Sequence, residues 1–189
     1  MDFAFLWAIL FIGARYRWYS NAMDEKTVRI ITTGGTFDKL YDAVKGELVF
    51  SESQLPRILA QSRVTLPIHL DNLLAVDSLV MTEEERRNIV SNAMLSHEKM
   101  VIIIHGTDTM VKTADLLKES LPPDDGHVFV FTGAMIPYAL ENSDAVFNLG
   151  CAMSAVQMLG SGVYITMGGR IYDAGRVRKN REKGIFEDV

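Results

Sequence analysis

Apolar positions along the chain form short continuous runs that alternate with stretches of helical spacing. The runs are typical of buried strands, at residues 28–32, 68–76, 100–104, 128–131 and 162–166. Apolar residues recur at helical spacing in the segments between most of them, at residues 53–61, 82–96, 109–121 and 143–158. Strands separated by helices imply right-handed crossovers. The pattern therefore predicts an α/β fold: a three-layer, doubly wound, mostly parallel sheet with helices on both faces.

Several local signals refine this prediction. Thr82 precedes Glu85 by three residues, the pattern of a capping box, so a helix is expected to begin there. The helix of residues 109–121 should end before two consecutive prolines. Residues 37–50 are polar and aromatic, which predicts a loop or hairpin, and the basic residues 176–183 are expected to form a solvated terminal segment.

The N-terminal segment differs from the rest of the chain. Residues 3–14 are apolar, but a helix that spans a bilayer needs about 20 apolar residues. Asp2 is acidic and the arginines follow the apolar run, which does not fit a signal peptide. We interpret residues 1–22 as a leader, a tag or a mis-assigned start outside the fold, with an export signal as the alternative, and residues 23–189 as a single α/β domain.

Composition narrows the function classes. The 189 residues are 48% hydrophobic and 23% charged, as in ordinary globular proteins, and the net charge of -5 gives no reason to expect a nucleic acid or a membrane as partner. Cys151 is the single cysteine, which fits a reducing, cytoplasmic location. The histidines have no metal-ligand spacing, so we predict no metal and no other cofactor.

Small polar residues gather where predicted strands end, at residues 33–36, 77–78 and 106–108. Because the carboxyl ends of parallel strands meet at one edge of the sheet, these segments can converge on one small ligand. A threonine hydroxyl becomes a nucleophile when a neighbour takes its proton, and backbone amides of a glycine turn can stabilise an oxyanion. These parts suit acyl transfer to water. The alternative for residues 33–36 is a purely structural turn whose threonines cap backbone groups.

Other motifs are absent or carry a structural interpretation. The glycine turn has neither the spacing of a phosphate loop nor that of a dinucleotide fingerprint, and there is no nucleophile elbow. His105 ends an apolar run, so we expect a packed, hydrogen-bonded histidine rather than a general base.

Two motifs together carry a family resemblance. The segments Thr33-Gly-Gly-Thr36 and His105-Gly-Thr-Asp-Thr109, in this order, resemble the paired signature of bacterial-type L-asparaginases. Further segments agree with it, at residues 77–82, 132–137 and 147–149. The resemblance runs from about Val28 to the C-terminus, and the chain is most similar to short members that carry only the N-terminal domain.

This resemblance implies hydrolysis of L-asparagine to L-aspartate and ammonia, with glutamine as a slower substrate in some members. It implies that Thr36 is the nucleophile and that Thr107 is the second catalytic threonine. Tyr41 would help to activate Thr36. Asp108 would bind the substrate α-amino group.

The remaining site residues implied by the resemblance bind the substrate. Asp77 and Ser78 would hold the α-carboxylate, and the backbone carbonyl of Ala134 would lie near the amide nitrogen. Gly35 and Gly106 belong to the same site.

Two departures from the family pattern follow. Family members pair Asp108 with a lysine from the helix after Phe-Asn-Leu, but residues 155–159 hold none, so either another cation substitutes, with Arg170, Arg176 and Arg178 as candidates, or the rate falls. Full-length members complete the site with the C-terminal domain of a neighbouring protomer; without it, either another part closes the pocket, for which a homo-oligomer is expected, or the pocket stays open and binds weakly.

These departures leave two alternatives to an L-asparaginase. One is a non-catalytic domain that binds an amino acid. The other is an amidase for a different amide, such as a glutaminyl or peptidyl group. In each case the partner is a small molecule.

Overall fold

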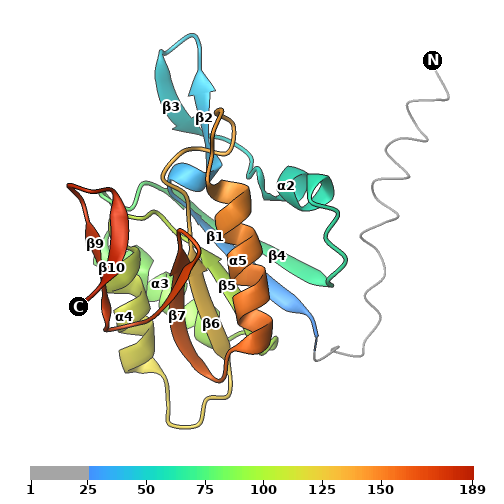
Figure 1. Ribbon diagram of the computed structural model, residues 1–189, viewed down its shortest axis with the longest axis vertical. Helices are drawn as coiled ribbons and strands as arrows, with labels where there is room; N and C mark the ends of the chain where they lie inside the picture. Colours follow the sequence, from blue (N-terminus) through green and yellow to red (C-terminus); the bar gives the residue numbers. More distant parts are fainter. Residues whose placement is uncertain (1–25) are drawn as a thin grey trace, which may run out of the picture.

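A computed structural model describes residues 26–189, so the interpretation of residues 1–22 lies outside the described residues. At its centre is a six-stranded sheet in the order β4-β1-β5-β6-β7-β8 (Figure 1). Neighbouring strands are parallel except that β7 and β8 are antiparallel. Its strands are β1 (Val28–Gly34), β4 (Ile68–Val76), β5 (Met100–Ile104), β6 (Val128–Thr132), β7 (Gly162–Met167) and β8 (Arg170–Asp173).

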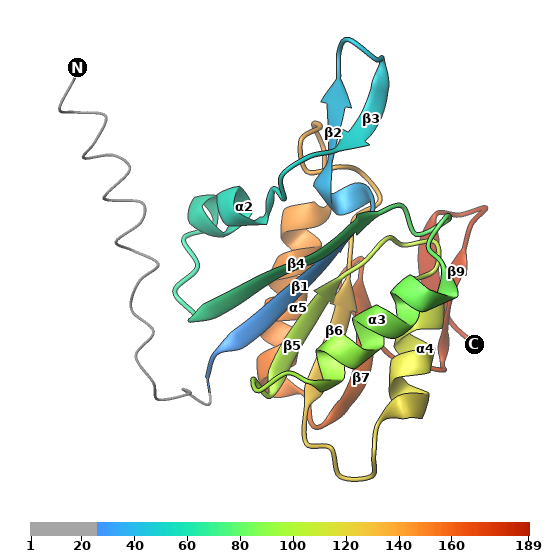
Figure 2. The same ribbon diagram turned by 180° about the vertical axis from the view of Figure 1, so that it is seen from behind.

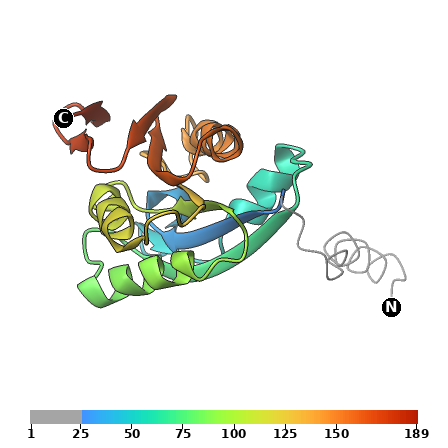
Figure 3. The ribbon, with the colours of Figure 1, turned by 90° about the horizontal axis from the view of Figure 1, so that it is seen from below.

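Two helices cover each face of this sheet and bury one apolar core on each side. Figure 2 shows α3 (Glu83–Met94) and α4 (Met110–Ser120) across one face, and Ile89 and Ala114 join the core there. The opposite face carries α2 (Leu55–Gln61) and α5 (Ala145–Met158), as the view from below shows (Figure 3). The predicted three-layer α/β architecture is therefore confirmed.

The predicted helix start at Thr82 is also confirmed. Its hydroxyl accepts a hydrogen bond from the backbone N–H of Glu85 at 3.2 Å, and the Glu85 carboxylate accepts one from the backbone N–H of Thr82 at 2.8 Å. These two bonds form a capping box, so α3 begins at a defined residue shortly after the turn that follows β4.

Residues 36–50 form a hairpin that projects from the edge of the sheet (Figure 1). A short 3-10 helix, η1 (Thr36–Asp38), leads into β2 (Lys39–Asp42), which pairs antiparallel with β3 (Glu47–Phe50). The sequence predicted either a loop or a hairpin for this segment, and the structure shows a hairpin.

The prediction of a solvated basic tail is wrong. Residues 177–180 form β9 (Val177–Asn180), which pairs antiparallel with β10 (Ile185–Asp188). Val177 and Phe186 are buried, and the Tyr172 hydroxyl donates a hydrogen bond to the Phe186 carbonyl at 2.7 Å. In the sequence, these few apolar positions lie among charged residues. In the structure, they join the core and hold the segment to the rest of the fold.

Within residues 26–189, no helix is long and apolar enough to cross a bilayer.

Candidate active site

The turns that follow β1, β4 and β5 contact one another directly. A Cβ atom built on Gly35 would lie 2.5 Å from both the Cα and the backbone N of Gly106. A Cβ atom on Gly106 would in turn lie 2.4 Å from Oγ of Ser78. Real Cβ atoms do not approach other atoms so closely, so only glycine allows these turns to touch. Thr36, Ser78 and Thr107 are thereby gathered at one edge of the sheet.

Thr36 opens η1 and is half-buried. Among residues 26–189, no group forms a hydrogen bond with its hydroxyl, which leaves this oxygen available to a ligand. As the first residue of η1, Thr36 also has a backbone N–H without a partner inside that helix.

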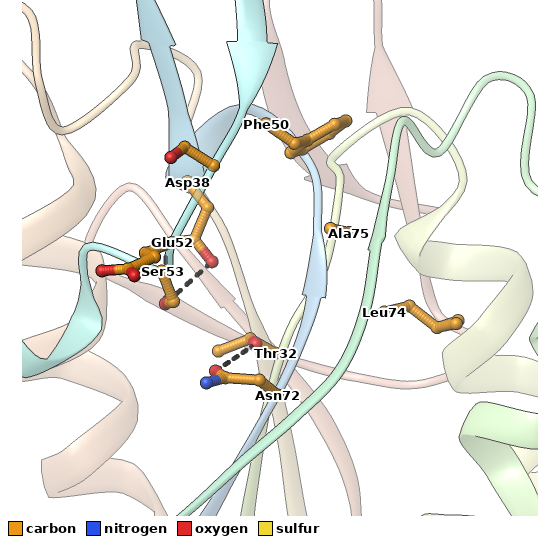
Figure 4. Close-up of a pocket in the computed structure, with 9 residues that line it drawn as sticks. Thr32, Asp38, Phe50, Glu52, Ser53, Asn72, Leu74 and Ala75 are labelled. Carbon is orange, nitrogen blue, oxygen red and sulfur yellow. Dashed lines mark hydrogen bonds between the residues drawn. The ribbon is translucent and has the colours of Figure 1, made fainter.

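Asp38 fixes this short helix in place. Its carboxylate accepts a hydrogen bond of 3.0 Å from the Ser53 hydroxyl (Figure 4). It accepts another of 3.0 Å from the backbone N–H of Gln54, at the start of α2. Asp38 is buried, and burial raises the pKa of its carboxyl group above the usual value. These contacts fix Asp38, two residues after Thr36, to the start of α2.

A cavity of about 140 Å³ lies beside Asp38, between the β1–β4 edge and residues 50–53 (Figure 4). Its polar lining is largely paired internally, since Thr32 donates to the Asn72 side-chain oxygen at 2.9 Å and Ser53 donates to Asp38. Neither Thr36 nor Thr107 lines it. The cavity is therefore separate from the threonine turns.

Thr107 and Asp108 share a lysine that the sequence analysis did not find. Nζ of Lys179, on β9, donates hydrogen bonds to Oγ1 of Thr107 at 2.7 Å and to Oδ1 of Asp108 at 2.9 Å. Thr107 is buried, and the Lys179 side chain is 11% exposed. A nearby ammonium group favours the deprotonated form of a hydroxyl, so this contact can activate Thr107.

The three arginines expected to replace the family lysine are consequently the wrong residues. A lysine does pair with Asp108, but it comes from β9 and not from the helix after Phe147. None of Arg170, Arg176 and Arg178 pairs with Asp108 within the described residues; Arg170 pairs with Asp188 and Arg178 with Glu187. A signal was available, because Val177 and Lys179 share one face of a strand with a period of two residues.

His105 is packed and hydrogen-bonded, as predicted. Its Nδ1 lies 2.9 Å from the Gly106 carbonyl and its Nε2 lies 2.8 Å from the Thr113 hydroxyl. A carbonyl only accepts hydrogen bonds, so Nδ1 carries the proton and Nε2 accepts one from Thr113. Burial lowers the pKa of His105 to about 4.

The buried Arg86 of α3 extends this hydrogen-bond network. Its guanidinium donates to the Thr113 hydroxyl and lies 3.4 Å from the Thr109 carbonyl. The Thr109 hydroxyl in turn donates to the Ser78 carbonyl at 2.9 Å. The network therefore holds the turns after β4 and β5 from beneath.

Asp77 is paired with Lys39, the residue that follows η1. Nζ of Lys39 lies 2.5 Å from Oδ2 of Asp77, and the backbone N–H of Leu79 donates to Oδ1 at 2.9 Å. Both bonds, that of Lys39 foremost, lower the pKa of the Asp77 carboxyl group below its usual value. Asp77 is therefore ionised at neutral pH.

Ala134 lies next to the turn of Thr107. A Cβ atom built on Gly133 would lie 3.4 Å from Cγ2 of Thr107, and Ala134 itself is buried. Asn148 of α5 holds this segment, since its side-chain amide donates to the Gly133 carbonyl at 3.0 Å and accepts from the Gly168 N–H at 3.1 Å.

Tyr41 is not brought to Thr36. It lies on β2 opposite Leu48, its side chain is 60% exposed, and its hydroxyl makes no hydrogen bond within residues 26–189. For metal chemistry, the described part of the chain offers no group of three or more His, Cys, Asp or Glu side chains that could hold an ion.

Comparison with known proteins places these residues in a family. The family described as "Asparaginase, N-terminal" matches residues 27–185. L-asparaginase 1 of Escherichia coli (strain K12) is 29% identical over 171 residues, which cover 86% of this chain and 50% of that protein. A glutamyl-tRNA(Gln) amidotransferase component of Archaeoglobus fulgidus is 33% identical over 177 residues, which cover 86% of this chain and 41% of that protein.

Solved structures agree with these sequence matches. The thermostable L-asparaginase from Thermococcus kodakarensis superimposes with a TM-score of 0.73 at 26% identity, covering 86% of this chain and 51% of that one. The chain thus spans about half the length of the curated L-asparaginase 1 that it matches. The family match includes both threonine turns and Lys179. The chain belongs to the asparaginase family, whose N-terminal domain it matches.

Proposed function

We propose that this chain hydrolyses the side-chain amide of L-asparagine to L-aspartate and ammonia, with Thr36 and Thr107 as its two catalytic hydroxyl groups. The observation that carries the proposal is the contact between the Gly35 and Gly106 turns, together with the hydrogen bond from Lys179 to Thr107. Membership of the asparaginase family supports amide hydrolysis as the reaction class.

The first half-reaction would use the free hydroxyl of Thr36. Its oxygen attacks the amide carbon while its proton passes to a neighbouring base, and a tetrahedral intermediate forms. The backbone N–H of Thr36, which has no partner within η1, is suited to donate to the oxyanion. The C–N bond then breaks and ammonia leaves with one added proton, so that the substrate acyl group is esterified to Thr36.

The second half-reaction would use Thr107 and water. The Thr107 hydroxyl, which accepts a hydrogen bond from the Lys179 ammonium group, accepts a proton from the attacking water and passes its own proton to the Thr36 oxygen. Attack of this water on the ester carbon breaks the bond to Thr36, so that L-aspartate is released and the Thr36 hydroxyl is restored.

Asp108 is suited to hold the α-ammonium group of the substrate. Its Oδ1 accepts the hydrogen bond of Lys179, and Oδ2 accepts none within the described residues. The side chain is partly exposed, at 30%. One carboxylate oxygen thus remains for a cationic group in the site.

Two observations bear on the alternatives. The idea of a non-catalytic amino-acid-binding domain rested on a missing lysine and a missing second domain, and Lys179 removes the first of these grounds. Several relatives are named as components of a glutamyl-tRNA(Gln) amidotransferase, which favours the side-chain amide of glutamine as a second candidate substrate. Homo-oligomerisation and a cytoplasmic location stay predictions.

Ammonia release tests the proposal. Purified wild-type chain, Thr36→Val and Thr107→Val are assayed with L-asparagine, L-glutamine and buffer alone. Each substitution is expected to lower ammonia release by at least about 100-fold, since it removes a group that transfers a proton or attacks the amide. Thr65→Val, at an exposed position, is the matched control and keeps the wild-type rate. Equal rates in all four proteins would refute the proposal.

A further inference from the structure

We propose that Lys39 binds the α-carboxylate of the substrate, and that this contact restricts the site to amino acids with a free α-carboxylate. The inference rests on the proposed function and deepens it, because it assigns the substrate class to one side chain. The resemblance implied Asp77 and Ser78 for this task and gave Lys39 no role.

Position is the first reason. Lys39 follows η1 directly, and its backbone N–H donates to the Thr36 carbonyl. Its side chain reaches the end of β4, where Nζ meets Asp77. Asp77 precedes Ser78, whose hydroxyl oxygen borders Gly106. The Lys39 ammonium thus lies beside the same turns that gather the two catalytic threonines.

Charge is the second reason. The Asp77 carboxylate is ionised, so it repels the carboxylate of an amino acid and is a poor partner for it. An ammonium group has three N–H donors. The structure shows one hydrogen bond to Asp77 and a position 5.5 Å from the centre of the Phe50 ring. Donor capacity is left for a substrate carboxylate, and Asp77 and Phe50 fix where it points.

The order of the strands supplies the third reason. In the sheet, β1 lies between β4 and β5, so the turn of Thr36 lies between the Lys39–Asp77 pair and the Lys179–Asp108 pair. The α-ammonium group is assigned to Asp108 on the β5 side. The α-carboxylate then faces the β4 side, where Lys39 is paired with Asp77 just after β4 ends.

Accessibility is compatible with this role. The Lys39 side chain is 17% exposed and that of Asp77 is 35% exposed, so the ion pair is partly covered but reachable from solvent. Arg181, 3.8 Å from Asp108, is 64% exposed and belongs to the opposite pair. A zwitterionic substrate therefore meets the Lys39–Asp77 pair on one side of Thr36, and Asp108 with the cations Lys179 and Arg181 on the other.

The test compares L-asparagine with its α-amide, which keeps the side-chain amide and the α-ammonium group but has no α-carboxylate. Steady-state kcat and KM are measured for the wild type, Lys39→Met and Lys39→Arg. Lys39→Met is expected to raise KM for L-asparagine by about 10- to 100-fold with little change in kcat, the effect of losing a charge-assisted hydrogen bond. KM for the α-amide should stay within about 3-fold of the wild type, because no charge-assisted bond is lost. Lys39→Arg should recover part of the loss.

Two further variants guard the interpretation. Lys45→Met removes an exposed lysine from the same hairpin and is expected to leave both KM values unchanged. Lys39→Met combined with Asp77→Asn removes the unpaired carboxylate that the single variant leaves behind, and it should still discriminate poorly between the two substrates.

An equal loss for L-asparagine and its α-amide would overturn the proposal, because it would show that Lys39 only stabilises the hairpin. Unchanged kinetics in Lys39→Met would overturn it as well. If the wild type releases no ammonia from either substrate, the proposed function fails instead. Calorimetry with L-aspartate then decides on Lys39 without turnover: weaker binding to Lys39→Met than to Lys45→Met supports the role, and equal binding refutes it.

Discussion

Replacing Gly35 with alanine tests the contact that brings the two catalytic turns together. The new Cβ atom would lie 2.5 Å from the backbone of Gly106, at a residue whose φ is +75°. Two separate costs follow. The backbone conformation is strained for any residue with a Cβ atom, and the Gly106 turn must move.

The size of each cost can be estimated. A residue with a Cβ atom held in this φ region costs about 1–3 kcal/mol. Overpacking a well-packed region costs about another 1–3 kcal/mol. We expect Gly35→Ala to lower the free energy of unfolding by about 2–6 kcal/mol, a large part of the about 5–15 kcal/mol typical of a folded protein.

Three other glycines separate the two costs. Gly46 has a φ of +71° and nothing within 4 Å of an added Cβ atom, so Gly46→Ala carries backbone strain alone, about 1–2 kcal/mol. Gly106 has no positive φ, so Gly106→Ala carries only the clash with Ser78. Gly150, in the exposed part of α5, has neither problem, and Gly150→Ala should stabilise the protein by about 0.5–1 kcal/mol.

Urea unfolding followed by far-UV circular dichroism gives the free energy of unfolding of each variant. The expected order of stability is Gly150→Ala, wild type, Gly46→Ala and then Gly35→Ala. If Gly35→Ala is no less stable than Gly46→Ala, the Gly35 and Gly106 turns are not in backbone contact and the geometry of the site is refuted.

Three further predictions follow from individual contacts. Lys179→Met should lower kcat/KM for L-asparagine by about 100-fold or more, because Thr107 loses its neighbouring cation. Arg178→Met, at the neighbouring exposed position, is the control and should leave kcat/KM unchanged. An unchanged kcat/KM in Lys179→Met would refute the role of Lys179. The pKa of His105 is about 4 in the fold and near 6.5 when unfolded, so the unfolded chain binds more protons between these values. The free energy of unfolding should therefore fall by about 3 kcal/mol as pH drops from 6.5 to 4. Urea titrations of His105→Gln at several pH values should lack this decrease. The same dependence of the free energy of unfolding on pH in His105→Gln and the wild type would contradict the prediction. Thr82→Ala should lower the free energy of unfolding by about 1 kcal/mol, since it removes one half of the capping box, and an unchanged urea midpoint would show that the box contributes nothing.

The elements that follow from local patterns were predictable from the sequence. The run Met100–Ile104 is a central strand because it is apolar on both faces, and the structure buries it between two layers of helices. Thr82 and Glu85 are three residues apart, so their capping box needs no distant partner. The proximity of the turns of Thr36 and Thr107 was predictable because the carboxyl ends of parallel strands meet at one edge of the sheet.

Long-range pairs between charged side chains were not predictable in this way. Lys179 reaches Thr107 from a residue 72 positions away, and Lys39 reaches Asp77 from 38 positions away. Within residues 176–183, the alternation of a strand puts Lys179 on the same face as the apolar Val177, but it does not indicate which distant residue Lys179 contacts. The burial of Val177 and Phe186, which holds β9 next to the site, was also not predictable, because it depends on residues distant in the sequence.

Crystallography of the chain with bound L-aspartate would test the shared site most directly. The side-chain carboxylate of the product is expected to lie within hydrogen-bond distance, about 2.6–3.2 Å, of both the Thr36 and the Thr107 hydroxyl, with its α-ammonium group on Asp108. L-Aspartate that binds elsewhere, for example in the cavity beside Asp38, or that touches only one of the two threonines, would contradict a common catalytic site.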